Sequence, residues 1–212
     1  MDPVSAIALT LGVGWASGIN LYAAILTLGL MDAAGAVVLP PDLQLLSSPI
    51  VIAAAALMYA VEFFADKVPG VDSGWDVLHT FIRIPAGAAM AAAAVWDVDP
   101  ALGLAAGLVG GTLATASHAM KAGSRLVINT SPEPFTNWGA SVAEDAAVIG
   151  GMWMAVTNPW LFLVLLVLFV LLVIWLLPKL WRVLKRIAAK IASWFRGTPA
   201  PAPGRPPDPT IG

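Results

Sequence analysis

Ionisable and amide side chains recur at helical spacing in this chain, and their types suit the binding of an ion or a small polar solute. Glu62 and Asp66 are four residues apart, so both carboxylates lie on one face of a helix. Three later runs of polar residues have the same spacing of three or four. The candidate binding residues are Asn20, Glu62, Asp66, Lys67, Asp72, Asp76, His79, Arg83, His118, Lys121, Arg125, Asn129, Glu133, Asn137, Glu144 and Asp145.

The depth of these charges leaves two interpretations open. Arg83 lies roughly 10 Å inside a helix that starts near Asp76, and a charge in the centre of a bilayer costs about 2.5–3.5 kcal/mol. The charged side chains must therefore face one another or water. One interpretation is a polar cavity open to the cytoplasm, and the other is an ion-paired latch that fixes two loops. For Asn20, hydrogen bonding between helices is a further alternative.

The sequence gives no sign of a metal site or of catalysis. The chain has two histidines and no cysteine, and the histidines lack the spacing of zinc ligands. No nucleophile, metal-protease or phosphate-loop motif is present. We therefore expect no metal, no cofactor and no enzymatic activity.

Composition places these residues in a membrane protein. The 212 residues are 59% hydrophobic and only 11% charged, with a mean hydropathy of +0.84, whereas ordinary soluble domains are roughly 25% charged. The net charge of −2 does not favour nucleic-acid binding. We expect an all-α polytopic bundle whose main partner is the lipid bilayer.

Six apolar stretches are long enough to cross a bilayer, since roughly 20 helical residues are needed. Two polar, proline-containing loops join the second stretch to the third and the fourth to the fifth, as two similar hairpins. The predicted spans are Val4–Leu30, Ser48–Ala65, Trp75–Trp96, Ala101–Met120, Trp138–Val156 and Trp160–Leu177.

The positions of the basic residues set the predicted orientation. On the six-span map, all eleven Lys and Arg residues fall in or near the even-numbered connections and the C-terminal tail. Loops rich in Lys and Arg stay in the cytoplasm, so both termini are predicted to be cytoplasmic. No basic residue precedes Lys67, so the N-terminus is expected to form the first span and not a cleaved signal peptide.

The C-terminal region divides into two parts after the bundle of residues 1–178. Residues 179–196 predict a basic amphipathic helix on the membrane surface, and residues 197–212 are proline-rich and expected to be disordered. Anionic lipid head groups are the expected partner of the helix, with a protein partner as the alternative. The membrane-surface residues are Lys179, Arg182, Lys185, Arg186 and Lys190.

A glycine stripe predicts close helix packing. Gly103, Gly107 and Gly111 are four residues apart, which lets a neighbouring backbone approach along one face. Packing within the bundle is the favoured interpretation. A homo-oligomer formed through the same stripe is the alternative that the sequence leaves open.

The polar loops resemble a family of bacterial membrane proteins. The matching segments are Glu62–Asp76 (EFFADKVPGVDSGWD), Arg83–Ala88 (RIPAGA), Lys121–Arg125 (KAGSR) and Asn129–Asn137 (NTSPEPFTN). They are similar to the family catalogued as domain of unknown function 4126, over about Val4 to Leu177. The resemblance implies a small multi-pass helical protein of the bacterial inner membrane and implies no activity.

Three functions are compatible with these observations. A transporter or channel for a small polar solute or ion is the first choice, because of the cost of burying the charges. A protein that binds or flips a lipid head group of the polyprenyl-phosphate type is the second, although seven acids outnumber four bases in the loops. A non-transporting scaffold that uses the C-terminal helix is the third.

Overall fold

The computed structural model is all-α and describes residues 1–68, 70–129 and 134–195, apart from the side chains of Pro134, Ile187 and residues 190–195. Proline begins each of the described helices except α3, and its fixed φ suits the first helical position. The helices are α1 (Pro3–Ala33), the 3₁₀ helix η1 (Pro41–Ser47), α2 (Pro49–Ala65), α3 (Val71–Ala93), α4 (Pro100–Ile128), α5 (Pro134–Thr157) and α6 (Pro159–Phe195).

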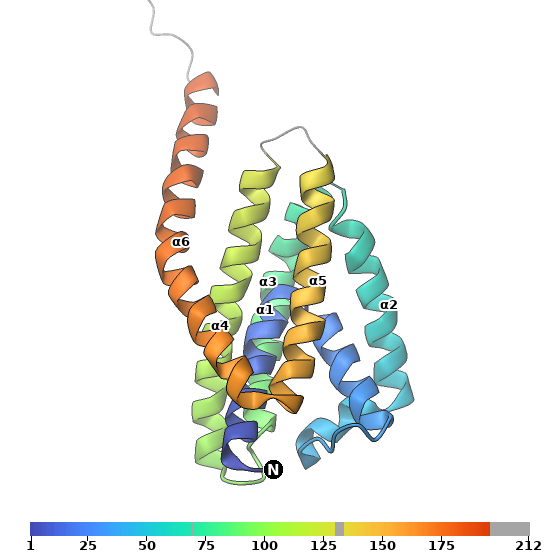
Figure 1. Cartoon of the computed structure of the whole chain (residues 1–212). Helices are drawn as coiled ribbons and strands as arrows, with labels where there is room; N and C mark the ends of the chain where they lie inside the picture. Colours follow the sequence, from blue (N-terminus) through green and yellow to red (C-terminus); the bar gives the residue numbers. More distant parts are fainter. Residues whose placement is uncertain (69, 130–133, 196–212) are drawn as a thin grey trace, which may run out of the picture.

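Helix α1 reverses direction inside the bundle. Asn20 has non-helical dihedral angles (φ −147°, ψ 96°), and its Oδ1 accepts a hydrogen bond from the amide of Ala23 at 2.9 Å. An asparagine in this conformation caps the start of a new helix, so α1 consists of two half-helices. Met1 and Leu39, on either side of α1, line one cavity, and Figure 1 shows both half-helices running to the same end of the bundle.

The prediction that residues 4–30 form one continuous spanning helix is therefore wrong, because α1 breaks at Asn20. By length and hydropathy alone, the described part of the chain holds three candidate spans, α1, α4 and Pro159–Arg186 of α6. A fourth joins η1 to α2 across a bend of 64°. Helices α3 and α5, which carry buried charges, are not among these candidates. The membrane prediction is confirmed at this coarser level of three to four candidate spans.

The reversal of α1 also places the N-terminus and the described end of α6 at opposite ends of the bundle (Figure 1). The prediction that both termini share one side assumed that α1 crosses once, since a hairpin and a crossing helix have the same apolar composition, and the C-terminus itself lies outside the described residues. The basic residues near the turn after α2, near the end of α4 and along the second half of α6 lie toward the end opposite the N-terminus, which we call the basic end.

Small residues let the first half of α1 sit at the centre of the bundle. A Cβ atom on Gly14 would lie 2.6 Å from the Cα of Gly110 in α4, so these two backbones are in direct contact. Gly87 of α3 faces Ser17, whose hydroxyl donates to the carbonyl of Arg83 at 2.9 Å. The buried hydroxyl thus ties the hairpin to α3.

The predicted glycine stripe lies between α4 and α3. A Cβ atom on Gly107 would lie 3.3 Å from the carbonyl oxygen of Ala88, and one on Gly111 would lie 3.2 Å from the Cβ of the same alanine. Gly103 faces the ring of Trp96. Gly110, which contacts α1, was not singled out from the sequence because it falls outside the four-residue spacing.

Helix α6 continues through Pro178 to Phe195, so the described structure has no break where a separate amphipathic helix was predicted. Proline removes one backbone donor but is tolerated where neighbouring groups compensate. Leu180, beyond the proline, lies beside Gly123 of α4. Of the predicted membrane-surface residues, Lys179 has its ammonium group over the ring of Trp175, at 2.9 Å from the centroid. The side chain of Lys190 lies outside the described part of the structure. The predicted tail from residue 197 lies outside the described residues.

Candidate functional site

The charged residues of four helices meet above the tip of the α1 hairpin. We call this group the ionic cluster, and it sits about two helical turns, roughly 10 Å, from the end of α4 at Ile128. Nearly all its side chains are buried. Its members are Glu62 and Asp66 from α2 and its C-cap, Asp76 and Arg83 from α3, Lys121 and Arg125 from α4, and Glu144 and Asp145 from α5.

Arg83 joins α3 to α2 inside the cluster. Its guanidinium donates to Glu62 Oε1 at 2.6 Å and to Asp76 Oδ1 at 2.9 Å. The side chains of Arg83 and Glu62 are 0% exposed. Asp76 is two helical turns before Arg83 on the same face, so the pairing within α3 follows from helix geometry.

Lys121 occupies the centre of the cluster and uses all three of its N–H donors. Its Nζ donates to Asp66 Oδ2 at 2.9 Å, to Glu62 Oε1 at 3.3 Å and to the carbonyl oxygen of Ile19 at 3.1 Å. The Ile19 carbonyl is free to accept because the helix breaks at Asn20, which leaves the last carbonyls of the first half-helix without partners in that helix. The break in α1 and the lysine are therefore parts of one site.

Arg125 connects α4 to α5. It makes a two-pronged contact with Glu144, with Nε to Oε1 at 3.3 Å and Nη2 to Oε2 at 2.7 Å. Its Nη1 donates to the carbonyl oxygens of Asp66 at 3.2 Å and Asn137 at 3.0 Å, and to the side-chain oxygen of Asn137. A fully buried arginine with this many partners is held in one position.

Asp145 differs from the other acids because no described cation forms an ion pair with it. Its Oδ1 accepts from Asn20 Nδ2 at 2.9 Å, so its described partner is the neutral residue at the break in α1. Within the described chain, four carboxylate oxygens of the cluster are buried without a hydrogen-bond partner. They are Glu62 Oε2, Asp66 Oδ1, Asp76 Oδ2 and Asp145 Oδ2.

The cluster carries more negative than positive charge, with five carboxylates against three cations. Lys67 lies just outside it, in the turn after α2, where its Nζ donates to the carbonyl of Phe63 at 3.0 Å and lies 3.5 Å from Ser141 Oγ. Burial lowers the pKa of the Lys67 ammonium, and the nearby carboxylates of Asp145 and Asp66 oppose that shift. Even when Lys67 is counted, the acids exceed the bases by one.

The two histidines flank the cluster, and His118 also contacts it, since its Nδ1 lies 3.4 Å from Nη1 of Arg83. The Nδ1 of His79 lies 2.9 Å from the carbonyl of Trp75, and its Nε2 lies 3.1 Å from the hydroxyl of Tyr22 in α1. The Nε2 of His118 lies 2.7 Å from the hydroxyl of Thr80. Both histidines thus connect helices around the site, and among the described residues no group of three His, Asp or Glu has the arrangement of a metal site.

Asp72 and Asn129 do not join the ionic cluster. The amide of Asn129 donates to both oxygens of Asp72 at 2.9 Å and to Ser73 Oγ at 3.0 Å, which links the end of α4 to the start of α3. This pair fits the latch that was the alternative interpretation of the loops. Glu133, also a predicted site residue, lies outside the described residues.

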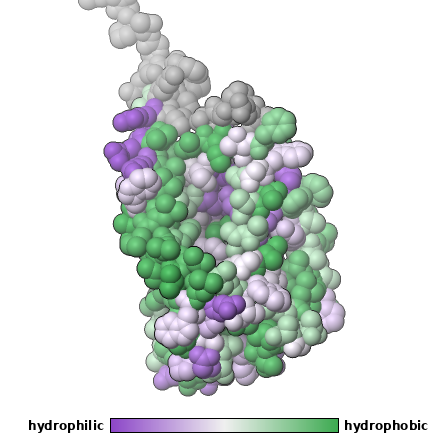
Figure 2. Space-filling model, in the orientation of Figure 1, coloured by the Kyte–Doolittle hydropathy of each residue, from purple (hydrophilic) through white to green (hydrophobic). Residues whose placement is uncertain are grey.

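A lateral opening leads from the side of the bundle toward the cluster. The backbones of α4 and α5 approach each other at few points, although Arg125 joins them through its side chain. A cavity of about 160 Å³ between the two helices is lined by Lys121, Glu144, Ile19 and Phe169, among others. Figure 2 shows hydrophilic residues in the hollow of this face, between hydrophobic columns. Glu144 has the most exposed side chain of the ion-paired residues, at 18%.

Sequence reasoning missed the parts of the site that are not charged. The Ile19 carbonyl, the Tyr22 hydroxyl and the Thr80 hydroxyl all contact predicted residues. A polar residue with capping preference inside an apolar run, as at Asn20, is the signal that predicts a helix break and the free carbonyls beside it.

The fold and the cluster define a class: a helical protein with several candidate membrane spans and a charged centre at a broken helix. The chain belongs to the family described as Domain of unknown function (DUF4126), which matches residues 7–179. The match covers the α1 hairpin from Ile7 onward and every member of the ionic cluster. No curated protein and no solved structure matches the chain.

Proposed function

We propose that this protein moves protons across a bacterial inner membrane, alone or coupled to a small polar solute, and that the ionic cluster is the site. The observation that carries the proposal is the excess of buried carboxylates at the tip of the broken helix α1. Transporters place their sites at the ends of half-helices near the middle of the bilayer, where unpaired backbone groups can bind the cargo.

The charge balance supports an ion as the cargo. Five carboxylates and three cations would leave two buried negative charges, and an uncompensated buried charge is strongly destabilising. Protons or other cations remove this cost. We favour protons because the acids are spread along the cluster, each at its own position, and not gathered as three or more ligands in the described chain.

Asp145 is our choice for the proton carrier. Its described hydrogen bond is to Asn20, and no described ion pair holds it in the charged form. An unpaired buried carboxylic acid favours the neutral form. Protonation would change the bond between Asp145 and Asn20, and so the position of the α1 tip relative to α5.

The membrane orientation follows from the same site. We propose that α2 to α6 cross the bilayer and that the α1 hairpin enters it from the N-terminal end. The basic end then faces the cytoplasm, so the N-terminus lies on the opposite side. The bilayer, with anionic head groups beside Lys179 and Arg182, is the partner we propose, and we propose no catalytic activity.

The test compares Asp145→Asn with Asp72→Asn in proteoliposomes that contain a pH-sensitive dye. An imposed membrane potential drives protons through the wild-type protein and through Asp72→Asn, whose substitution lies outside the cluster. Asp145→Asn is expected to abolish the flux because an amide cannot carry the proton, while its melting temperature stays equal or rises because a carboxyl group that is costly to ionise at this site is removed. Equal flux in all three proteins, or no flux in the wild type, would refute the proposal.

A further inference from the structure

Two neighbouring cavities beside α1, one between α5 and α6 and one between α4 and α5, make up what we call the groove. The lower cavity has a volume of about 320 Å³ and is apolar, with Trp15, Gly150, Met154 and Phe162 among its lining residues. The upper cavity is the one of about 160 Å³ that reaches Glu144. Phe169 lines both cavities, so the apolar cavity and the one that holds Lys121 and Glu144 adjoin at this ring.

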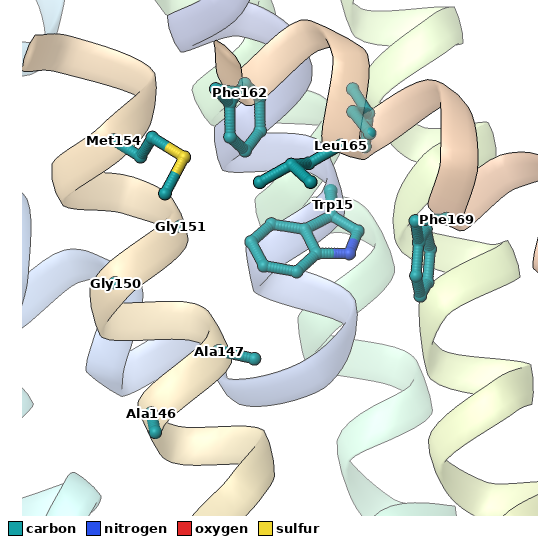
Figure 3. Close-up of a pocket in the computed structure, with 10 residues that line it drawn as sticks. Trp15, Ala146, Ala147, Gly150, Gly151, Met154, Phe162, Leu165 and Phe169 are labelled. Atoms are coloured by element: carbon teal, nitrogen blue, oxygen red, sulfur yellow. The ribbon is translucent and has the colours of Figure 1, made fainter. Parts of the chain in front are cut away.

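Trp15 places a hydrogen-bond donor in this groove. Figure 3 shows its indole between the α5 backbone at Gly150 and Gly151 and the α6 side chains Leu165 and Phe169, with the ring nitrogen on the side of Phe169. Trp15 is 8% exposed, and among the described residues its Nε1 is buried with no hydrogen-bond partner. Buried indole N–H groups usually have an acceptor, so the donor indicates a ligand with an oxygen atom at this point.

The charged end of the groove holds Lys121 and Glu144. Lys121 is 2% exposed and its three donors are occupied, so it has none left for an incoming phosphate. Glu144 is 18% exposed and belongs to a cluster with excess negative charge. Both oxygens of Glu144 already accept from Arg125, so it is the excess negative charge of the cluster, with Glu144 as its most exposed ion-paired member, that attracts an ammonium group entering from the lipid side.

From this order of groups we infer that the groove binds one zwitterionic membrane lipid with a primary ammonium head group, such as phosphatidylethanolamine. Its acyl chain occupies the apolar cavity, a phosphate or ester oxygen accepts from Trp15 Nε1, and its ammonium group approaches Glu144. The upper cavity holds several water-sized groups, which is sufficient for an ethanolammonium group. This inference does not depend on proton transport.

Position 150 allows a direct test. A Cβ atom on Gly150 would meet no atom within 4 Å, so Gly150→Leu fills the groove without a clash with the described chain. Gly139, on the same helix, is also exposed and equally open but outside the groove, which makes Gly139→Leu a matched control. Both changes replace a helical glycine by leucine and raise helix propensity equally.

The full-length protein is placed in nanodiscs of equal parts phosphatidylethanolamine and phosphatidylglycerol and is then released into mild detergent. Native mass spectrometry measures which lipid stays bound to it and at what occupancy. The wild type and Gly139→Leu are expected to retain one phosphatidylethanolamine. Gly150→Leu should lower this occupancy about tenfold, the factor expected when two methylene groups of the chain lose their site.

Two results would overturn the inference. One is that Gly150→Leu retains as much phosphatidylethanolamine as the wild type does. The other is that the wild type retains phosphatidylglycerol to the same extent as phosphatidylethanolamine. If Gly150→Leu does not fold, Ala147→Phe blocks the same cavity from one turn away and is judged by the same two results. Proton flux is measured in parallel, so a failure of the lipid site is distinguishable from a failure of the proposed transport.

Discussion

The bond between Arg83 and Glu62 offers the sharpest test of the ionic cluster as a coupled unit. The two side chains are fully buried and 2.6 Å apart. At an effective dielectric constant of about 20, unit charges at that distance attract by roughly 6 kcal/mol before desolvation is subtracted. Removing one partner of such a pair typically costs about 3–5 kcal/mol, because the other charge remains buried and uncompensated.

We therefore expect Arg83→Gln and Glu62→Gln each to lower stability by about 3–5 kcal/mol. With a shift of roughly 2–4 °C per kcal/mol for a chain of this size, the melting temperature falls by about 6–20 °C. The double variant replaces both charges by amides that can bond each other, so it should be more stable than the sum of the single changes predicts. The assay is thermal unfolding in mild detergent for all four proteins.

The control for this cycle pairs Arg83→Gln with Asp72→Asn, since Asp72 makes its described side-chain bonds outside the cluster. Those two changes should add within about 0.5 kcal/mol, as distant sites do. If Arg83→Gln and Glu62→Gln are equally additive, their bond contributes no coupling. The cluster would then be a set of independent surface-like pairs, contrary to its burial.

Three further predictions address the hairpin and the orientation. Asn20→Ala should cost about 0.5–2 kcal/mol in thermal unfolding through loss of the cap, and an unchanged melting temperature would argue against the break. Gly14→Ala should cost about 1–3 kcal/mol because its Cβ atom has no room against α4, whereas Gly139→Ala, in open space, should be neutral or stabilising. Because the chain lacks cysteine, Val38→Cys should react with an impermeant thiol reagent on intact cells and Ala188→Cys only after permeabilisation; the reverse pattern would invert the topology.

The helical faces of the site were predictable because they are local. A spacing of three or four residues places side chains together on any helix, so the faces that carry Glu62 with Asp66 and Asp76 with Arg83 follow from the sequence. The cost of isolated charges in lipid then requires that such faces meet. The structure brings eight of the predicted residues into one cluster, with Asn20 and Asn137 bonded to it.

The path of α1 was not predictable from hydropathy. A window of apolar residues reports composition, and a hairpin buried among other helices has the composition of a span. Two features determine that α1 reverses. One is local, because Asn20 caps the second half-helix. The other is a packing contact, because Gly14 allows the first half-helix to touch α4. Similarly, Pro178 ends a helix in an isolated peptide more readily than in one that is already packed on a neighbour.

The separation of Asp72 from the cluster could not be predicted from the spacing of residues along the helix. Asp72 is one turn before Asp76, yet its carboxylate binds Asn129 and the turn at Gly70. The choice depends on where the end of α4 lies in space, which no local pattern contains. Here the latch and the site are different groups of residues, although the sequence presents them as one set.

The latch interpretation and the binding interpretation of the cluster itself differ in one measurable quantity, its net charge. A latch reaches its lowest energy when acids and bases balance, because every unpaired buried charge is costly. This cluster does not balance: Arg83, Lys121 and Arg125 are each shared among acids, and Asp145 forms no described ion pair. A cluster with a purely structural role would be more stable with Asn at position 145. The carboxylate at this position is instead what the proposed transfer of protons requires.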